Sequence, residues 1–147
     1  MLAAIKVLAT EPHDYKTLCI DTLDWLEPMA MAHLSKEHGV PITDSKVFGW
    51  GNADKMAATM FLGLLQFLER LQARTGMHVI LLAHGEIKKF QTPAGDDFDR
   101  WQLALGKKVS MAVSQWPDEV LFANYEDLTR EQNDRAKGVG GAERMLY

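Results

Sequence analysis

The sequence contains little cysteine and no long run of apolar residues. Cys19 is the single cysteine among 147 residues, which excludes an internal disulfide framework and suits a reducing compartment. No apolar run approaches the roughly 20 residues that a transmembrane helix requires. The opening segment, MLAAIKVLATEPHDYK, has no continuous apolar stretch before a cleavage site, so we predict no secretory signal. These absences predict a cytoplasmic protein without a membrane partner.

Positive charge is not in excess either. The chain has 16 Lys and Arg residues against 20 Asp and Glu residues, which gives a formal net charge of −4. A generally basic nucleic-acid-binding protein is therefore not expected, because such proteins bind largely by neutralising phosphates. The composition, 47% hydrophobic and 24% charged, is that of a globular protein, and the length suits one domain over residues 1–147.

The motifs of several common site types are missing. His84-Gly85-Glu86 begins like a zinc deaminase signature, but no P-C-x-x-C follows it, and H-E-x-x-H is absent. The phosphate-binding loop G-x-x-x-x-G-K-[ST] is absent as well, and the glycine-rich segments 49–52 and 137–144 do not match it. The sequence thus excludes zinc deamination and contains no Walker A motif.

The spacing of apolar residues predicts alternating helices and strands. Helical spacing predicts helices over 2–10, 23–38, 53–75 and roughly 100–115. Short apolar segments predict strands over 17–21, 78–83 and 118–123. This alternation indicates an α/β fold with a mostly parallel sheet, in which ligands bind beyond the carboxyl ends of the strands.

Local signals add detail to the predicted elements. The apolar side of helix 23–38 is expected to contain Trp25, Leu26, Met29 and Leu34. Cys19, within an apolar run, is expected in the core. Asn52 is expected to cap the next helix, and Gly39 and Gly76 are expected to end the two helices.

The remaining segments are polar. Residues 41–54 and 88–99 are predicted to be loops. Residues 124–147 are expected to form a flexible, charged and Gly-rich tail that ends in a short strand at 143–147. Two aromatic groupings, Phe48-Gly-Trp50 and DFDRW at 97–101, are candidates for stacking on nucleic acid or for contact with a partner.

Asp21 and Asp24 follow the first predicted strand, and their pattern has two interpretations. Asp21 can cap the next helix while Asp24 stabilises its first turn. Alternatively, Asp21 is an acid of the Walker B type, placed at a strand end near a nucleotide-bound Mg²⁺, which prefers oxygen ligands. Strands of α/β proteins often end in Asp, so this pattern leaves both interpretations open.

His84 follows the second predicted strand in the same way. An isolated histidine at such a position can be purely structural. Its imidazole can also hydrogen-bond a γ-phosphate or position an attacking water. Because Asp21 and His84 both follow apolar strands, we expect them at the same edge of the sheet.

Three consecutive stretches carry a resemblance to a known family. They are YKTLCIDTLDWLEP, FGWGNADKMAATMFLGLLQFLERL and HVILLAHGEIKKFQTPAGDDFDRWQLALGKKVSMAVSQWPDEVLFANYE. In this order and spacing the chain resembles the ATP-binding proteins of phages, which are RecA-like P-loop ATPases associated with recombination and single-strand annealing. The resemblance covers nearly the whole chain, from Leu2 to Tyr147.

The resemblance implies a three-layer RecA-like core and a set of site residues. It implies that Asp21 is the Walker B acid and metal ligand, that Asp24 contributes to cofactor binding, and that His84 senses the γ-phosphate. Asp118 matches an acid that opens a later strand, where its role is structural. The family's cofactors are ATP and Mg²⁺, its further ligand is single-stranded DNA, and its location is the cytoplasm of a phage-infected bacterium.

The missing Walker A motif departs from the family pattern. Because the chain begins as if within a helix, we expect an N-terminally truncated ATPase that does not bind Mg-ATP tightly or hydrolyse it as it stands. A second reading is a naturally shortened, non-catalytic binding or inhibitor protein that self-associates or binds a protein partner. A third is a small α/β protein that binds another ligand at the same strand ends.

Overall fold

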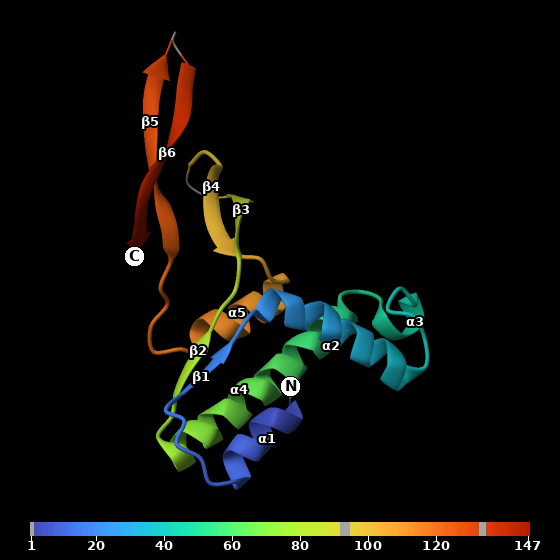
Figure 1. Cartoon of the computed structure of the whole chain (residues 1–147). Coiled ribbons are helices and arrows are strands. Elements are labelled where there is room, and N and C mark those ends of the chain that lie inside the picture. Colours follow the sequence, from blue (N-terminus) through green and yellow to red (C-terminus); the bar gives the residue numbers. More distant parts are fainter. Residues whose placement is uncertain (1, 92–94, 133–134) are drawn as a thin grey trace. The chain divides into compact units, whose positions relative to one another are not determined.

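The computed structural model describes residues 2–91, 95–132 and 135–147 (Figure 1). The chain divides into two compact units, Met1–Trp116 and Pro117–Tyr147, and each is described by itself. Within the described residues, none of the helices combines the length and apolar character that a bilayer span requires.

The first unit is a mixed α/β structure. Its helices are α1 (Leu2–Thr10), α2 (Leu23–His38), α3 (Ser45–Phe48), α4 (Asn52–Thr75) and α5 (Lys107–Gln115). Its strands are β1 (Thr17–Ile20), β2 (His78–Leu81), β3 (Gly85–Phe90) and β4 (Phe98–Leu103). The helices predicted at the start of the chain and before Gly39 and Gly76 are confirmed, as are the first two strands.

Strands β1 and β2 form a small parallel sheet. The register pairs Thr17 with His78 and Ile20 with Leu81, and the connection between the strands runs through α2, α3 and α4. The predicted parallel arrangement is therefore confirmed for these two strands. The other described strands form two antiparallel pairs, β3–β4 and β5–β6.

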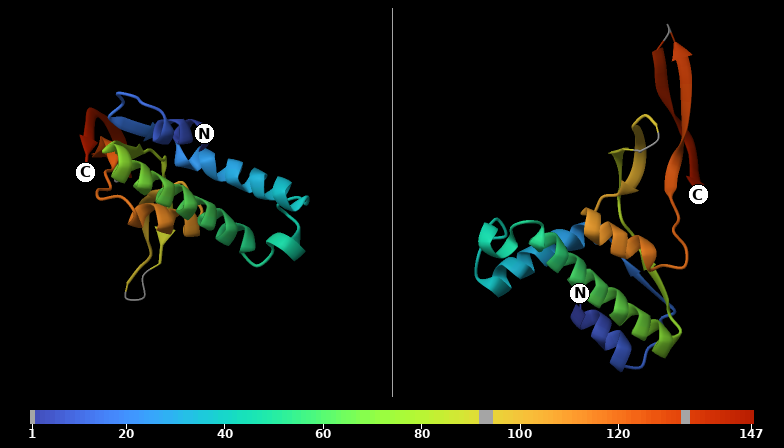
Figure 2. Two further views of the ribbon diagram at one scale, coloured as in Figure 1. Left: turned by 90° about the horizontal axis from the view of Figure 1, so that it is seen from below. Right: turned by 180° about the vertical axis from the view of Figure 1, so that it is seen from behind.

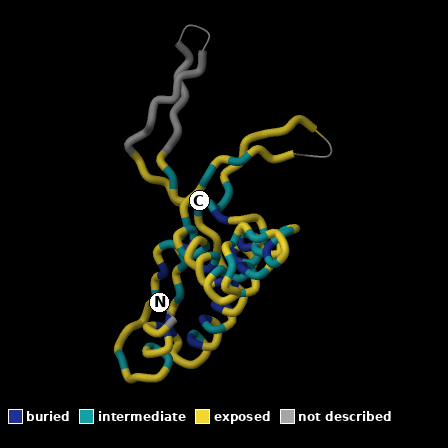
Figure 3. The backbone as a smooth tube through the Cα atoms, turned by 90° about the vertical axis from the view of Figure 1, so that its right-hand side faces the viewer, coloured by how far each residue is buried: buried dark blue, intermediate teal, exposed yellow. Residues whose placement is uncertain are grey.

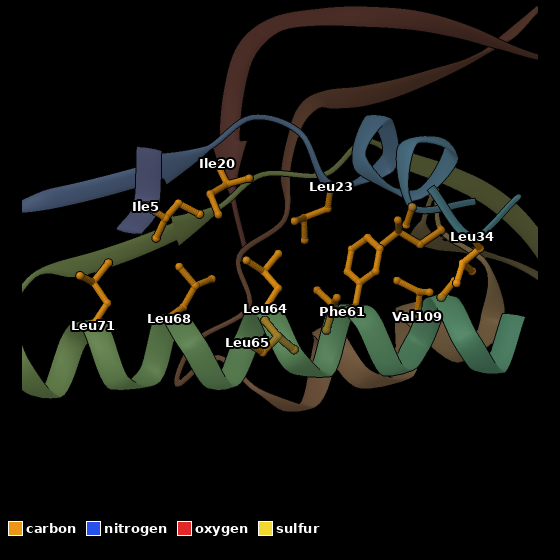
Figure 4. Close-up of a cluster of buried hydrophobic side chains, with 14 of the residues drawn as sticks. Ile5, Ile20, Leu23, Leu34, Phe61, Leu64, Leu65, Leu68, Leu71 and Val109 are labelled. Carbon is orange, nitrogen blue, oxygen red and sulfur yellow. The ribbon is translucent and has the colours of Figure 1, made fainter. Parts of the chain in front are cut away.

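Among the described residues, helix α4 contributes more buried side chains to the hydrophobic core than any other element. Its buried side chains recur at helical spacing: Ala57, Phe61, Leu64, Leu65, Leu68 and Leu71. Of these, Phe61, Leu64, Leu68 and Leu71 point toward β1, β2 and α2 (Figure 4). Helices α1, α2 and α5 all contact α4 (Figure 2), and they contribute Ile5, Leu34 and Val109, among others, to the core.

The two faces of the β1–β2 sheet differ because side chains alternate along a strand. Ile20 is buried and Leu18 packs against the core, on the face that α4 covers. Cys19 lies on the opposite face and is exposed, so its predicted place in the core is wrong. Ile80, its register partner on β2, is 47% exposed.

Two predictions about helix surfaces and ends are corrected. In α2 the buried residues are Leu23, Ala30 and Leu34, whereas Trp25 is 72% exposed and Met29 is 64% exposed. At 100° per residue, Trp25 and Met29 lie on the far side of the helix from that buried stripe. Asn52 does not cap α4; it is the first helical residue, and its side chain donates to the Val47 carbonyl over 2.6 Å.

The segment predicted as a loop followed by a helix is largely a β-ribbon. Strands β3 and β4 pair antiparallel from Gly85 with Leu103 to Phe90 with Phe98, so the predicted loop over 88–99 is wrong at 88–90 and 98–99. Residues 91 and 95–97 lie outside the strands, and 92–94 lie outside the described residues. The helix expected from about residue 100 begins at Lys107. Cross-strand pairs such as Ile87 with Trp101 stabilise the ribbon, and no local sequence pattern predicts these pairs.

The second unit is an antiparallel pair of strands, β5 (Ala123–Gln132) and β6 (Arg135–Leu146). The predicted strand over 118–123 is wrong up to Phe122, since β5 begins at Ala123, and Asp118 lies outside any strand. The short strand predicted near the C-terminus is part of β6. The Phe122 and Tyr147 backbones exchange two hydrogen bonds of 2.9 Å. Figure 3 shows the buried positions of the first unit.

Candidate functional site

The candidate site lies where the two parallel strands end. Asp21 follows Ile20 directly, and Leu82 to His84 follow β2. The two strand ends are joined, because the Leu82 N–H donates to the Ile20 carbonyl over 2.9 Å and the Leu23 N–H donates to the Leu82 carbonyl over 2.8 Å. The structure therefore brings Asp21 and His84 to one edge of the sheet, as the sequence predicts.

Asp24, in the first turn of α2, holds His84 through two contacts. The backbone N–H of His84 donates to Asp24 Oδ1 over 3.0 Å. The imidazole Nδ1 of His84 lies 2.9 Å from Asp24 Oδ2. Asp24 is only 15% exposed, whereas the imidazole is 66% exposed. Both carboxylate oxygens thus face His84, which keeps an open side toward solvent.

These contacts shift the pKa values of both side chains. Partial burial disfavours the charged form of Asp24, but the hydrogen bonds from the His84 backbone and imidazole outweigh it and lower its pKa from 3.8 to about 2. The hydrogen bond to Asp24 and then its negative charge raise the pKa of His84 above 6.5, with a smaller contribution from Asp21. The negative charges of Asp24 and Asp21 therefore favour a cationic imidazole at His84.

Asp21 is exposed, and within the described residues its carboxylate has no hydrogen-bond or ion-pair partner. No group of three or more His, Cys, Asp or Glu side chains that could enclose a metal occurs in that part of the chain. Mg²⁺ in nucleotide sites is usually held by one or two carboxylates, by water and by the phosphates themselves. A free carboxylate at a strand end fits that kind of metal site.

Glu27, which the sequence analysis did not single out, forms a second contact from α2. Its Oε2 accepts the Gly106 N–H over 2.8 Å, where the chain enters α5. Glu27 and Asp24 are three residues apart and lie on the same side of the helix. That spacing is the only local signal in the sequence that links the two acids.

The aromatic groupings have different surroundings. Phe48 is buried against His38, with ring centroids 5.4 Å apart, whereas Trp50 is fully exposed. On the β3–β4 ribbon, the Phe90 and Phe98 centroids are 5.4 Å apart, and the Arg100 guanidinium carbon lies 5.3 Å from the Phe90 centroid. The ribbon therefore has one face with exposed aromatic and basic side chains.

An open groove of about 630 Å³ runs along α2 beside the site. Asp24 lines one end of it, but neither Asp21 nor His84 does. Its other lining residues are mainly apolar or small: Glu27, Pro28, Met31, Ala32, Ser35, Ile42 and Ala104. The groove is thus separate from the strand ends at which the sequence predicts a ligand.

Comparison with known families identifies the protein class. A family model described as an AAA domain matches residues 1–147. The chain belongs to the AAA domain family. Membership supports a nucleotide-binding, ATPase-related function, and the cofactors of the AAA domain are ATP and Mg²⁺. Searches of curated proteins and of solved structures gave no match to this AAA domain.

Proposed function

We propose that Asp21 and His84 form the Walker B and sensor half of a magnesium–ATP site. The carrying observation is that both residues follow adjacent, parallel, in-register strands, whose ends are joined by backbone hydrogen bonds. Ligands of open α/β sheets bind at this position. The same proposal extends to the finer class, a RecA-like phage ATPase that works in recombination or single-strand annealing.

Each side chain has a distinct role in this proposal. The Asp21 carboxylate holds the metal ion, directly or through a metal-bound water. A cationic His84 donates from Nε2 to a terminal phosphate oxygen. Bound Mg-ATP supplies the transferable phosphoryl group and a cation that neutralises its charge. Asp24 keeps its two hydrogen bonds to His84 and acts through it, in place of the direct cofactor contact that the sequence predicts.

The 147 residues contain no phosphate-binding loop, so the chain provides only part of such a site. The missing backbone amides and lysine normally supply most of the phosphate affinity. We therefore propose that this chain alone binds Mg-ATP more weakly than millimolar and that hydrolysis depends on a phosphate-binding loop outside this sequence. In a three-layer core, further elements would cover the exposed face of β1 and β2 that Cys19 and Ile80 now occupy.

Titration of the ¹⁵N-labelled chain with Mg-ATP, followed by NMR, tests this function. Shifts confined to the amides of Asp21, Thr22, His84 and Gly85 are expected, without saturation at millimolar ligand. Asp21→Asn should abolish them, whereas Asp14→Asn, which changes an exposed acid before β1, should not. Shifts at other sites, or unchanged shifts in Asp21→Asn, would contradict the proposal.

A second candidate function is that of a non-catalytic binding protein. It is favoured by the exposed apolar residues Ile80 and Leu82, which are 47% and 41% exposed at the end of the sheet. Such a protein would associate with a second copy or with another protein chain. Size-exclusion chromatography with light scattering tests self-association: a dimer that Ile80→Glu dissociates supports it, and a monomer at all concentrations argues against it.

A further inference from the structure

Two carboxylates on α2 hold the chain on both sides of the β3–β4 ribbon. Asp24 binds His84, the residue immediately before β3, and Glu27 binds Gly106, which follows β4 and precedes α5. The two acids are three residues apart, so one turn of helix reaches the chain that enters the base of the ribbon and the chain that leaves it. Neither contact is required to form the ribbon's own ladder, which runs from Gly85 to Leu103.

His84 is the point at which the site and the ribbon meet. Its carbonyl accepts the Ala104 N–H over 2.8 Å, which closes the base of the ribbon. Its N–H and imidazole are both turned to Asp24. Every hydrogen-bonding group of His84 except Nε2 is therefore engaged by α2 or by the ribbon, within the part of the chain that the structure describes.

Gly106 allows the second contact. A Cβ built at Gly106 would lie 2.6 Å from Glu27 Oε1, closer than side-chain atoms normally approach. The carboxylate occupies the space that any other residue would need for its side chain. A side chain at position 106 would therefore displace the end of the Glu27 side chain from its present contact.

We propose that Asp24 is a positioning residue that holds His84 with its proton on Nδ1 and Nε2 toward the ligand, and that Glu27 anchors the chain that leaves the base of the ribbon at Gly106. The assignment of a phosphate to Nε2 rests on the proposed function; the positioning itself does not. The charged groups that act on His84 are Asp24, from α2, and Asp21, at the end of β1.

The arrangement has a chemical consequence at neutral pH. Asp24 is ionised, because its pKa is about 2, and its charge and hydrogen bond favour the protonated imidazole. A protonated His84 presents an N–H donor at Nε2, which suits an anionic oxygen such as that of a terminal phosphate. A neutral His84 held by the same contact has its proton on Nδ1 and presents Nε2 as an acceptor.

Long-range ¹H–¹⁵N NMR of the imidazole nitrogens tests the positioning in the whole chain. The five histidines are assigned by single substitution, His84 through His84→Gln. In the wild type, neutral His84 is expected as the Nδ1–H tautomer, with a titration midpoint above 6.5. Asp24→Asn, which keeps the shape but removes the charge, should lower the midpoint and mix the tautomers.

Glu27→Gln is the matched control on the same side of α2. It should leave the titration of His84 unchanged but speed hydrogen exchange of the residue-106 amide several-fold, and Gly106→Ala should do the same relative to the intrinsic rate for alanine. If His84 has the same titration midpoint in Asp24→Asn as in the wild type, the role of Asp24 is overturned. The Nε2–H tautomer in the wild type would also overturn it, and this measurement needs no folded variant. Unchanged protection of the residue-106 amide in both variants would overturn the role of Glu27.

Addition of inorganic triphosphate separates this proposal from the proposed function. A shift of the His84 Nε2 signal that disappears in Asp24→Asn supports both. If triphosphate has no effect while the tautomer and midpoint depend on Asp24, the proposed function fails and the positioning role stands. A triphosphate shift that is equal in the wild type and in Asp24→Asn supports the phosphate contact and contradicts the positioning.

Discussion

Asp24 and His84 are 60 positions apart in the sequence, and the carboxylate of Asp24 is hydrogen-bonded to both the backbone N–H and the imidazole Nδ1 of His84. The contact joins the first turn of α2 to the residue that follows β2. The contact sets the orientation of the His84 side chain at the end of the parallel sheet. The proposed ATPase role depends on this orientation.

Because of the Asp24–His84 pair, the free energy of unfolding is expected to decrease both at high pH and at low pH. The pKa of His84 is raised, so its contribution is fully present below pH 6.5 and is lost as the pH rises through the raised value. The pKa of Asp24 is lowered, so its contribution is present above pH 3.8 and is lost as the pH falls toward about 2. Urea unfolding over this range measures both losses.

Substitutions separate this pair from the other titrating groups. His84→Gln should remove the decrease in unfolding free energy on the alkaline side, and Asp24→Asn should reduce the decrease on both sides. The other four histidines are the same in all variants, so only the difference from the wild type counts. Identical pH profiles of wild type and Asp24→Asn would show that the contact contributes nothing to folding.

Leu68 tests the central role of α4 in the core. It is fully buried, whereas Leu62 on the same helix is 46% exposed. Leu68→Ala should lower the free energy of unfolding by about 2–5 kcal/mol, because it removes buried methyl groups and leaves a cavity. Leu62→Ala should change it by less than about 0.5 kcal/mol. Equal effects in denaturant unfolding would contradict the assigned buried face.

Two glycines should respond in opposite directions to the same substitution. A Cβ at Gly49 would collide with the backbone carbonyl of Ser45, so Gly49→Ala should destabilise the protein by about 1–3 kcal/mol. Gly63 lies inside α4 with no atom near a built Cβ, and Gly63→Ala should stabilise it by roughly 0.5–1 kcal/mol. Thermal unfolding measures the stability change of both variants. If Gly63→Ala is destabilising, position 63 does not have the open space for a side chain that the structure shows.

The ribbon predicts weak, salt-sensitive binding of single-stranded DNA. Phe98, 49% exposed, lies beside Phe90 and near the guanidinium of Arg100. Phe98→Ala should cost about 1–3 kcal/mol of binding to a labelled oligothymidine, the usual loss for one stacked base. Trp25→Ala, which removes an exposed aromatic side chain on α2, should have no effect. Equal losses in both variants, or tight binding that salt does not weaken, would contradict a stacking surface on the ribbon.

The sequence predicts the parts of the fold whose signal is local. The seven-turn helix α4 has a strongly periodic apolar stripe, and β1 and β2 are short apolar runs bounded by polar residues. The ribbon is different, because charged residues stand among its aromatic ones and its stabilising pairs join distant positions such as Phe90 and Phe98. The exposed position of Trp25 likewise depends on which side of α2 faces the core.

The candidate site shows the same division. Asp21 and His84 are predicted by their places after apolar strands, which is a local feature. The partnership of Asp24 with His84 and that of Glu27 with Gly106 depend on how α2 packs, and they span 60 and 79 positions. No window of sequence contains both members of either pair, so only the folded structure reveals them.

Paramagnetic NMR with Mn²⁺ in place of Mg²⁺, in the presence of ATP, tests the central claim most directly. Mn²⁺ broadens the signals of nearby nuclei even when binding is weak. If the metal–nucleotide site lies at the ends of β1 and β2, the amide signals of Asp21, Thr22, His84 and Gly85 should broaden first. Asp21→Asn should abolish this broadening, and Asp14→Asn should retain it. Broadening centred elsewhere in the chain, or persisting in Asp21→Asn, would show that the ends of β1 and β2 are not a metal–nucleotide site.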